Sequence, residues 1–203
     1  MAEPLLKLDE LAVHFTVGSA LKGGTKTLKA VDGVSLDVRP GECLGLVGES
    51  GCGKSTLALA IMGLIPPTHG RIVLNGHELS RRERMETART VQMVFQDPYA
   101  SLNPRQTVRR TLADPLRLHG VTNRSEVDQR VMDMMAKVGL RPDHADRYPH
   151  EFSGGQRQRI GIARALILKP RLVICDEPVS ALDVSIQAQV LNLLRELQRD
   201  MGL

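Results

Sequence analysis

Aromatic residues are scarce in this chain: its 203 residues include no tryptophan, two tyrosines and three phenylalanines. Charge of one sign is also lacking, since 27 basic and 23 acidic residues leave a net charge of only +4. The densest basic stretch, Arg81–Arg84, is interrupted by Glu83 and has no aromatic residue near it on which a base could stack. The composition therefore allows a nucleic-acid or membrane partner but does not indicate one.

Cysteines and long apolar runs are few. The chain has an odd number of cysteines: Cys43, Cys52 and Cys175. Since no two of them have metal-ligand spacing, they are predicted to be free thiols in a reducing compartment. The longest apolar stretch, residues 57–65, is too short to cross a bilayer. At the start, no basic segment leads into an apolar run, so no signal peptide is expected. The sequence predicts a soluble cytoplasmic protein; if it works at a membrane, other chains must supply the spans.

What the chain does contain is a series of strand patterns. Alternating apolar residues predict half-exposed antiparallel strands at 11–15 and 34–38, with a loop over 18–27 between them. The apolar run 43–48 ends in glycine and is expected to be a buried parallel strand. Further strands are expected at 71–76, which ends in an Asn-Gly turn, at 91–96 and at 172–177.

Helical patterns fill most of the remaining chain. One helix is expected to begin near Lys54 and to end at about residue 63. The segments 107–120 and 124–140 predict two helices of an insertion of roughly fifty residues. A further helix should follow SGGQ, and a last amphipathic helix should cover 186–202. With 42% apolar residues to form a core, the overall pattern predicts an α/β fold.

The stretch GESGCGKS at 48–55 fits the phosphate-loop pattern GxxxxGK[ST]. Glycines let the backbone wind around a phosphate with its N–H groups inward, and the helix that follows adds its dipole. We expect Lys54 to reach the β- and γ-phosphates and Ser55 to ligate Mg²⁺. A chance match in about 200 windows has odds below about 1%, with glycine at about 7% of residues. The predicted nucleotide loop comprises Gly48, Glu49, Ser50, Gly51, Cys52, Gly53, Lys54, Ser55 and Thr56.

Two carboxylates, Asp176 and Glu177, end the strand expected at 172–177. One carboxylate at such a place can hold the hydration shell of Mg²⁺, and the second can polarise an attacking water. A pair of carboxylates at the exposed end of a strand is also common without any function. Together with the phosphate loop, the four apolar residues before Asp176 favour the catalytic interpretation.

Gln96 and Phe15 each have two interpretations. An amide oxygen at the end of the strand 91–96 could touch the metal and the water, but surface solvation is the simpler explanation of a single glutamine. Phe15 could stack on an adenine, but a lone phenylalanine in a strand usually belongs to the core.

A second helix start suited to an anion follows about a hundred residues after the first, in EFSGGQRQR at 151–159. These motifs, in this order and over nearly the whole chain, resemble the ATP-binding cassette (ABC) ATPases. The matching motifs are the Walker A loop 48–56, the Q-loop Gln96, the signature Ser153-Gly154-Gly155-Gln156, the Walker B segment Leu172–Asp176, the following Glu177 and the D-loop Ser180-Ala181-Leu182-Asp183.

The resemblance implies one domain with a P-loop NTPase core, an antiparallel β subdomain and a helical subdomain. Residues 1–96 would hold the antiparallel layer and the Walker A part of the core, 97–152 the helical subdomain, and 153–203 the signature helix, Walker B, D-loop and last helix.

In this family two cassettes pair head to tail, and ATP lies between the Walker A loop of one and the signature of the other. Ser153 would hydrogen-bond the partner's γ-phosphate, while Gly154 and Gly155 would allow close backbone approach. Closing on ATP and opening after hydrolysis would be the power stroke. The family pattern implies further roles: adenine stacking for Phe15, Mg²⁺ and γ-phosphate sensing for Gln96, general base for Glu177 and contact across the dimer for Asp183.

A narrower resemblance, to the ATPases of oligopeptide, dipeptide and nickel importers, is carried by 97–105 (DPYASLNPR), VGESGCGKST and PVSALDVSIQAQVLNLL. It implies a bacterial importer with two permease subunits, an extracytoplasmic substrate-binding protein and often a second related ATPase. The chain would lie at the cytoplasmic face of the inner membrane, with 97–105 and the helical subdomain receiving the permease's cytoplasmic helix. Peptide is implied as cargo by kinship alone, and nickel or another small solute is the alternative.

Two other classes are weighed against this importer. A soluble cassette ATPase acting on nucleic acid generally carries a long coiled coil, zinc-binding cysteine clusters or two cassettes in one chain, none of which is present. A regulatory module that binds without hydrolysing is disfavoured by the intact Asp176 and Glu177. The family's switch histidine falls beyond Leu203, and none of the six histidines follows His150. The sequence is therefore expected to be a fragment that binds ATP weakly and hydrolyses it slowly.

Overall fold

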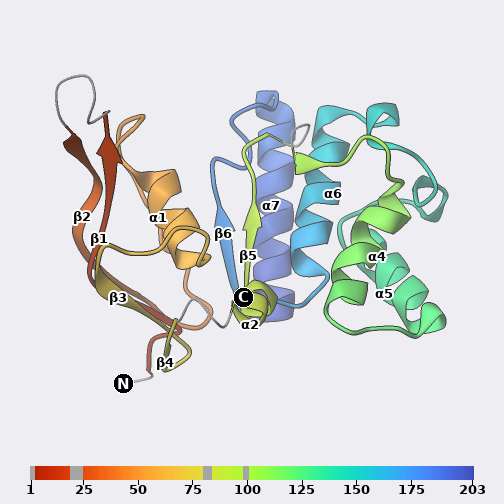
Figure 1. The fold of residues 1–203 in the computed structure, drawn as a ribbon. Coiled ribbons are helices and arrows are strands. Elements are labelled where there is room, and N and C mark those ends of the chain that lie inside the picture. The colour runs from red at the N-terminus through yellow and green to blue at the C-terminus, as the bar shows by residue number, and fades with distance from the viewer. Residues whose placement is uncertain (1–2, 19–24, 80–83, 98–100) are drawn as a thin grey trace. The chain divides into compact units, whose positions relative to one another are not determined.

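The computed structural model describes residues 3–18, 25–79, 84–97 and 101–203 (Figure 1). They belong to two compact units, Met1–Ala88 and Arg89–Leu203. Residues 81–83 of the basic stretch, 19–24 of the expected loop and 98–100 of the importer-like segment lie outside the described residues. The finer predicted division into 1–96, 97–152 and 153–203 stays a prediction.

The first unit contains an antiparallel sheet of four strands in the order β2-β1-β3-β4 (Figure 1). The two alternating segments form antiparallel strands as predicted, and the structure pairs them with each other. Asn75 and Gly76 join β3 to β4 with φ angles of 55° and 80°, as a two-residue type I′ hairpin turn requires, so the predicted Asn-Gly turn is confirmed. The strands are β1 Leu6–Val17, β2 Lys26–Val38, β3 His69–Leu74 and β4 His77–Glu78.

Helix α1, Lys54–Ile61, packs on β1 and β2 and confirms the helix expected after the phosphate loop. Leu57, Ala60 and Ile61 of this helix are buried. The burial of these side chains stabilises the packing of the helix on the sheet, and the position of the helix sets where the phosphate loop ends.

The strand expected at 43–48 is wrong for this structure. The segment forms no strand, and Leu44, Leu46 and Val47 are 47%, 50% and 94% exposed. A parallel strand needs ladder hydrogen bonds from neighbours. The four-stranded antiparallel sheet of this unit gives the segment no partner. Apolar composition alone therefore did not place it in a sheet.

The second unit is built on two parallel strands, β5 Val91–Val94 and β6 Leu172–Cys175 (Figure 1). Their register pairs Val91 with Leu172 and Val94 with Cys175. Both strands were predicted, but β6 is half-buried rather than buried. It has a strand neighbour on one side only among the described residues, so part of its surface stays open.

Helices cover this strand pair and form the larger core. The predicted helices are confirmed, and side-chain caps fix the starts of two of them: Thr107 accepts from the backbone N–H of Arg110, and Asn123 from that of Glu126. The short helix α2 was not predicted. In the described ranges, every helix is too short or too polar to span a bilayer. The boundary between the two units falls within α2 Arg84–Thr90. The helices of the second unit are α4 Val108–Leu118, α5 Arg124–Lys137, α6 Gly154–Leu166 and α7 Val184–Met201, with short 3-10 turns at Pro142–His144 and Pro149–Glu151.

Candidate nucleotide-binding and catalytic site

The phosphate loop lies at the N-terminus of α1. Its lysine is turned back into the loop: Lys54 Nζ donates to the carbonyl oxygens of Gly48 and Glu49, each at 2.7 Å. The N-cap residue Gly53 supplies no side-chain cap, and the first turn of α1 holds no acidic residue. A helix start with a lysine and without a competing carboxylate suits an anion, because its first N–H groups have no partner within the helix.

Gly53 is required by the backbone as well as by the motif. Its φ of 100° lies in the left-handed region, and a Cβ built there would stand 2.0 Å from the carbonyl oxygen of Ala30. Ala30 has no partner in the β1–β2 register, which passes from Val13↔Val31 to His14↔Lys29. The register thus shifts at Ala30, the residue whose carbonyl oxygen leaves no room for a side chain at position 53.

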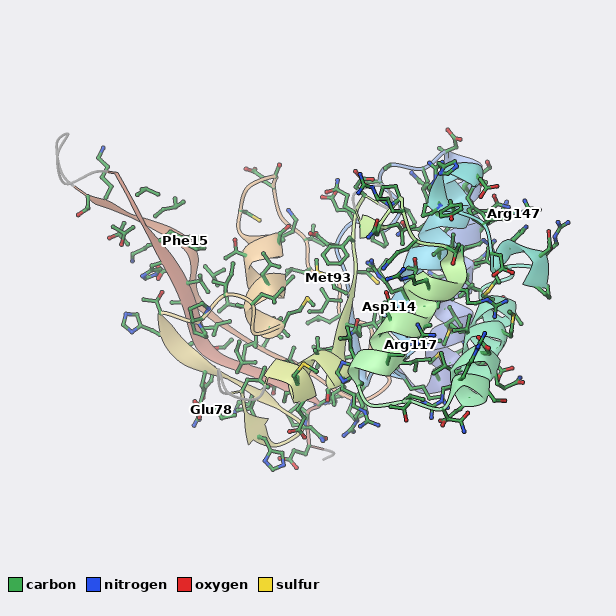
Figure 2. All side chains as sticks on the ribbon, turned by 45° about the vertical axis from the view of Figure 1, so that its right-hand side comes forward. Phe15, Glu78, Met93, Asp114, Arg117 and Arg147 are labelled. Carbon is green, nitrogen blue, oxygen red and sulfur yellow. The ribbon has the colours of Figure 1, made fainter. Side chains whose placement is uncertain are left out.

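Phe15 lies on β1, where Figure 2 labels it, and is 36% exposed. The interpretation of Phe15 as a core residue is therefore wrong. Val13, two residues earlier on the same face of β1, pairs with Val31, and Val31 lies 3.6 Å from the position of a Cβ on Gly53. Phe15 thus shares a sheet face with the phosphate loop. Its cross-strand partner Leu28 is also exposed, at 53%.

The second unit brings Gln96 and Glu177 together. Parallel strands end at the same edge of a sheet, and the pairing of Val94 with Cys175 places the residues that follow β5 and β6 side by side. Gln96 Nε2 donates to Glu177 Oε2 at 3.0 Å across a separation of 81 residues. The interpretation of Gln96 as a merely solvated surface residue is therefore incomplete.

Ser180 completes this group and was missed as a site residue. Gln96 Nε2 also lies 3.3 Å from Ser180 Oγ, and Ser180 Oγ donates to the Glu177 carbonyl at 3.1 Å. The D-loop motif contained Ser180, but no spacing rule links it to Gln96. Asp176, the residue before Glu177, donates its backbone N–H to the carbonyl of Val94 at 3.1 Å. The predicted carboxylates thus stand where two parallel strands end.

The signature stretch begins α6 with a reciprocal cap. Ser153 Oγ accepts from the N–H of Gln156 at 3.4 Å, and the Gln156 side-chain oxygen accepts from the N–H of Ser153 at 3.0 Å. The Ser153 hydroxyl acts here as an acceptor, so its own hydrogen can still be donated to a ligand. Gln156 serves as the other half of the cap.

Gly155 has a packing role that the sequence did not indicate. A Cβ at Gly155 would stand 2.6 Å from Cγ2 of Ile186, in the first turn of α7. At Gly154 the corresponding contact, with Leu182, would be 3.4 Å. The two glycines had been explained by close approach to a phosphate. At least one of them is also needed so that α6 can pack against α7.

A buried arginine holds the chain before the signature. Arg157 is 7% exposed, and it donates from Nε to the carbonyl of Pro149 at 2.6 Å and from Nη2 to that of His150 at 3.2 Å. These bonds tie the approach to Ser153 to the helix that follows it. A buried arginine within an amphipathic helix gives no sequence signal that separates it from a surface one.

The remaining predicted residues lie nearby in the same unit. Asp183 is the N-cap residue of α7, is exposed and makes no side-chain capping bond. In the importer-like segment, Leu102 is buried and Arg164 of α6 donates to the carbonyl of Ser101. Burial lowers the pKa of Arg164 from its usual value. Ser101, in the middle of 97–105, is thus anchored on the signature helix.

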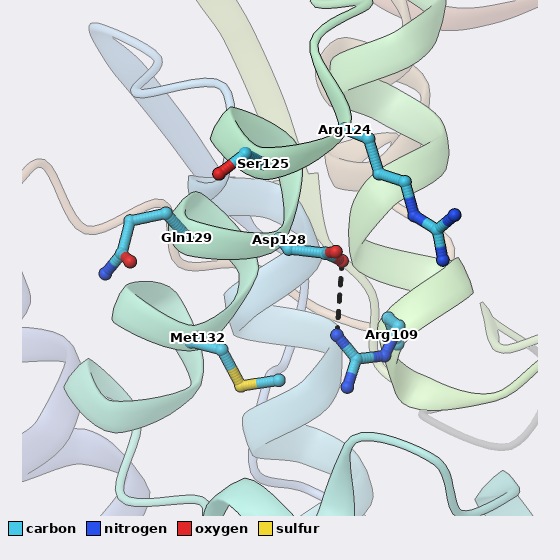
Figure 3. Close-up of a pocket in the computed structure, with 6 residues that line it drawn as sticks. All are labelled: Arg109, Arg124, Ser125, Asp128, Gln129 and Met132. Atoms are coloured by element: carbon cyan, nitrogen blue, oxygen red, sulfur yellow. Dashed lines mark hydrogen bonds and ion pairs between the residues drawn. The ribbon is translucent and has the colours of Figure 1, made fainter.

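One pocket of about 530 Å³ lies between α4 and α5, away from all of these residues. Figure 3 shows Arg109 and Asp128 paired at its edge, with Nη1 and Oδ1 3.1 Å apart. Arg109 also pairs with Asp146. The pKa of the Arg109 guanidinium is raised, mainly by its hydrogen bond to Asp146 and to a smaller extent by that to Asp128. Asp114 and Arg117 on α4 (Figure 2) form a further pair at 3.8 Å. This surface is charge-compensated and contains no predicted site residue.

Comparisons with known proteins agree with the motifs. Residues 31–180 match the ABC transporter family. The chain is 58% identical to the oligopeptide transport ATP-binding protein OppF of Escherichia coli (strain K12), over 98% of this chain and 62% of that protein. It is 51% identical to AppF of Bacillus subtilis (strain 168), another oligopeptide transport ATP-binding protein, over 99% of this chain and 63% of that protein.

Solved structures support the fold. The ATP-binding cassette MJ0796, described as a dimer in a post-hydrolysis state with ADP and Pi, superposes with a TM-score of 0.83 at 28% identity. The superposition covers 97% of this chain and 84% of that chain. The predicted α/β fold of the P-loop NTPase type is therefore confirmed. The chain spans about 62% of the length of OppF.

Proposed function

The chain belongs to the ABC transporter family, and from that premise we propose that it is the ATP-binding and ATP-hydrolysing subunit of a peptide importer. The observation that carries the hydrolytic part is the contact between Gln96 and Glu177 at the ends of two parallel strands. The peptide cargo rests on the oligopeptide transport relatives OppF and AppF. A glutathione import ATP-binding protein, GsiA of Pectobacterium atrosepticum, is also 52% identical over the whole of this chain.

The phosphate loop fits the triphosphate of ATP. Lys54 would exchange its bonds to the carbonyls of Gly48 and Glu49 for phosphate oxygens, which bind an ammonium group more strongly because they are charged. Phe15 would stack on the adenine, since it is exposed on the sheet face shared with the loop. Gly51 and Gly53, both with positive φ, would let the loop backbone curve around the phosphates.

The residues assigned to Mg²⁺ offer the oxygen ligands that this ion prefers: the Ser55 hydroxyl, the Gln96 amide oxygen and the Asp176 carboxylate. Within the described ranges no group of three histidine, cysteine or acidic residues competes as a metal site. When bound, Mg²⁺ would neutralise charge on the phosphate oxygens.

Glu177 would act as the general base. Its carboxylate would accept a proton from the attacking water, while Gln96 holds the carboxylate in place through its Nε2–H. Gln96 would then report the state of the γ-phosphate to the segment 97–105, because that segment starts one residue later and its middle residue, Ser101, is bound by Arg164 of α6. The loss of the γ-phosphate on hydrolysis would in this way be transmitted to the helical part of the unit.

The signature would serve a second cassette. Ser153, Gly154 and Gly155 stand at the start of α6, where the helix dipole and the serine hydroxyl favour an anion. We propose a head-to-tail pair in which this start binds the γ-phosphate held by the partner cassette, with Asp183 near the shared surface. The partner is either a copy of this chain or a related ATPase.

The other proposed partners are two permease subunits and, through them, an extracytoplasmic substrate-binding protein. The chain would sit as a peripheral subunit at the cytoplasmic face of the bacterial inner membrane. The exposed residues 103–105 would contact the permease, because they follow the anchored Ser101 and Leu102. No nucleic-acid partner is proposed.

Calorimetry of Mg-ATP binding by the wild type and Lys54→Ala tests the first part of this proposal. We expect binding to weaken by about tenfold or more, because a charge-assisted bond to phosphate contributes about 1.5–3 kcal/mol. Lys169→Ala, an exposed lysine outside the loop, serves as the control and should bind as the wild type does. Equal affinity of Lys54→Ala and the wild type would contradict the assignment of 48–56.

A further inference from the structure

We propose that Ser180 is a positioning residue for Glu177, and that its hydroxyl fixes both the backbone of Glu177 and the amide of Gln96. This inference rests on the proposed function, in which Glu177 is the general base. No role was assigned to Ser180 by the motif alone.

The first argument concerns the backbone of Glu177. Its φ is 45°, in the left-handed region that non-glycine residues seldom adopt. Such a conformation persists only where the surroundings hold it. Two donors of Ser180 converge on the Glu177 carbonyl oxygen: the backbone N–H at 3.2 Å and the hydroxyl at 3.1 Å. Ser180 therefore closes the turn that follows β6 and sets the direction in which the Glu177 side chain leaves the backbone.

The second argument concerns Gln96. A serine hydroxyl has one hydrogen and two acceptor sites, and the hydrogen here is donated to the Glu177 carbonyl. Its oxygen is then left to accept from Gln96 Nε2 at 3.3 Å, while the same nitrogen donates to Glu177 Oε2 at 3.0 Å. A carboxylate oxygen can only accept, so the amide nitrogen must face it. The amide oxygen of Gln96 therefore points away from Glu177, which leaves it available for the proposed binding of Mg²⁺.

The third argument is that one hydroxyl joins three segments. Gln96 follows β5, Glu177 follows β6, and Ser180 precedes α7. Removing the hydroxyl leaves the backbone bond from the Ser180 N–H to Glu177 in place but deletes both side-chain bonds. The orientation of the base should then loosen, while the bonds of Lys54 to Gly48 and Glu49 do not involve Ser180.

The test compares Ser180→Ala with the wild type in the full-length protein, using steady-state phosphate release over a range of Mg-ATP concentrations. We expect kcat to fall about tenfold with KM for ATP nearly unchanged, because misplacing a reacting group slows the chemical step rather than binding. Ser180→Thr, which restores a hydroxyl, should recover most of the rate. Ser185→Ala, an exposed serine in the first turn of α7, is the matched control and should keep the wild-type rate.

The outcomes separate the two proposals. A wild-type rate for Ser180→Ala, equal losses in Ser180→Ala and Ser180→Thr, or a change confined to KM would each overturn the role of Ser180 while leaving the ATPase intact. If the wild type itself releases no phosphate above the level of Glu177→Gln, the proposed function fails and this inference fails with it. Circular dichroism melting of each variant identifies any loss that comes from unfolding.

Discussion

Gly155→Ala tests the contact between α6 and α7, because it adds one carbon atom at the point where the two helices meet. The added Cβ would stand 2.6 Å from Cγ2 of Ile186, a separation that carbon atoms in folded proteins do not tolerate. Ile186 cannot move its methyl away easily, because β-branched side chains in helices are largely confined to one χ1 rotamer. The helix α6 or α7 must therefore shift.

The expected magnitude is the difference of two effects. Forcing an extra methyl into a packed contact costs about 1–3 kcal/mol. Replacing glycine by alanine inside a helix contributes about 1 kcal/mol in the opposite direction. Gly155→Ala should therefore lower the free energy of unfolding by about 1 kcal/mol, with a range of about 0–2 kcal/mol.

A second variant tests whether the clash with Ile186 causes the loss of stability, because it should reverse the sign of the effect of Gly155→Ala. In an Ile186→Ala background the methyl in question is absent, so only the gain in helix propensity remains. There, Gly155→Ala should stabilise the protein by about 1 kcal/mol. The coupling between the two positions should thus be about 1–3 kcal/mol, which a double-mutant cycle measures. Urea unfolding followed by circular dichroism suits this chain, because it has no tryptophan for fluorescence.

The same variants separate packing from phosphate contact. If Gly155 is also needed for close approach to the partner's γ-phosphate, Gly155→Ala in the Ile186→Ala background will stabilise the protein but still lower ATP hydrolysis. If its role is only packing, Gly155→Ala in that background will leave ATP hydrolysis at the level of Ile186→Ala. A destabilisation by Gly155→Ala that is unchanged in the Ile186→Ala background would refute the contact as the cause.

Two further predictions concern the assembled transporter. In a Glu177→Gln background, which keeps ATP but lacks the base, we expect an ATP-bound cassette dimer on a sizing column; adding Ser153→Arg should abolish it, because a long cation would fill the place of the partner's phosphate. Persistence of that dimer would contradict the role given to SGGQ, provided that the natural partner is included. Arg105→Glu should reduce peptide uptake in reconstituted vesicles while Mg-ATP binding stays unchanged, since Arg105 is exposed beyond the anchored Leu102; a loss of ATP binding would instead assign this segment to the nucleotide pocket.

Features that depend on neighbouring residues could be predicted from the sequence. The phosphate loop at the start of α1, the helix start at SGGQ, and the turn at Asn75 and Gly76 each follow from the chemistry of a few consecutive side chains. Such local preferences act before any distant contact forms, so a pattern of residues is enough to predict them.

Features that depend on the register of distant segments became visible only in the three-dimensional structure. The bond between Gln96 and Glu177, 81 residues apart, exists because β5 and β6 pair in one particular parallel register. The need for glycine at 155 comes from a side chain of α7. The exposure of 43–48 goes with the lack of a neighbouring strand among the described residues of its unit. Local periodicity contains no information on which distant residue a given atom will meet, because that choice is made by packing over the whole unit.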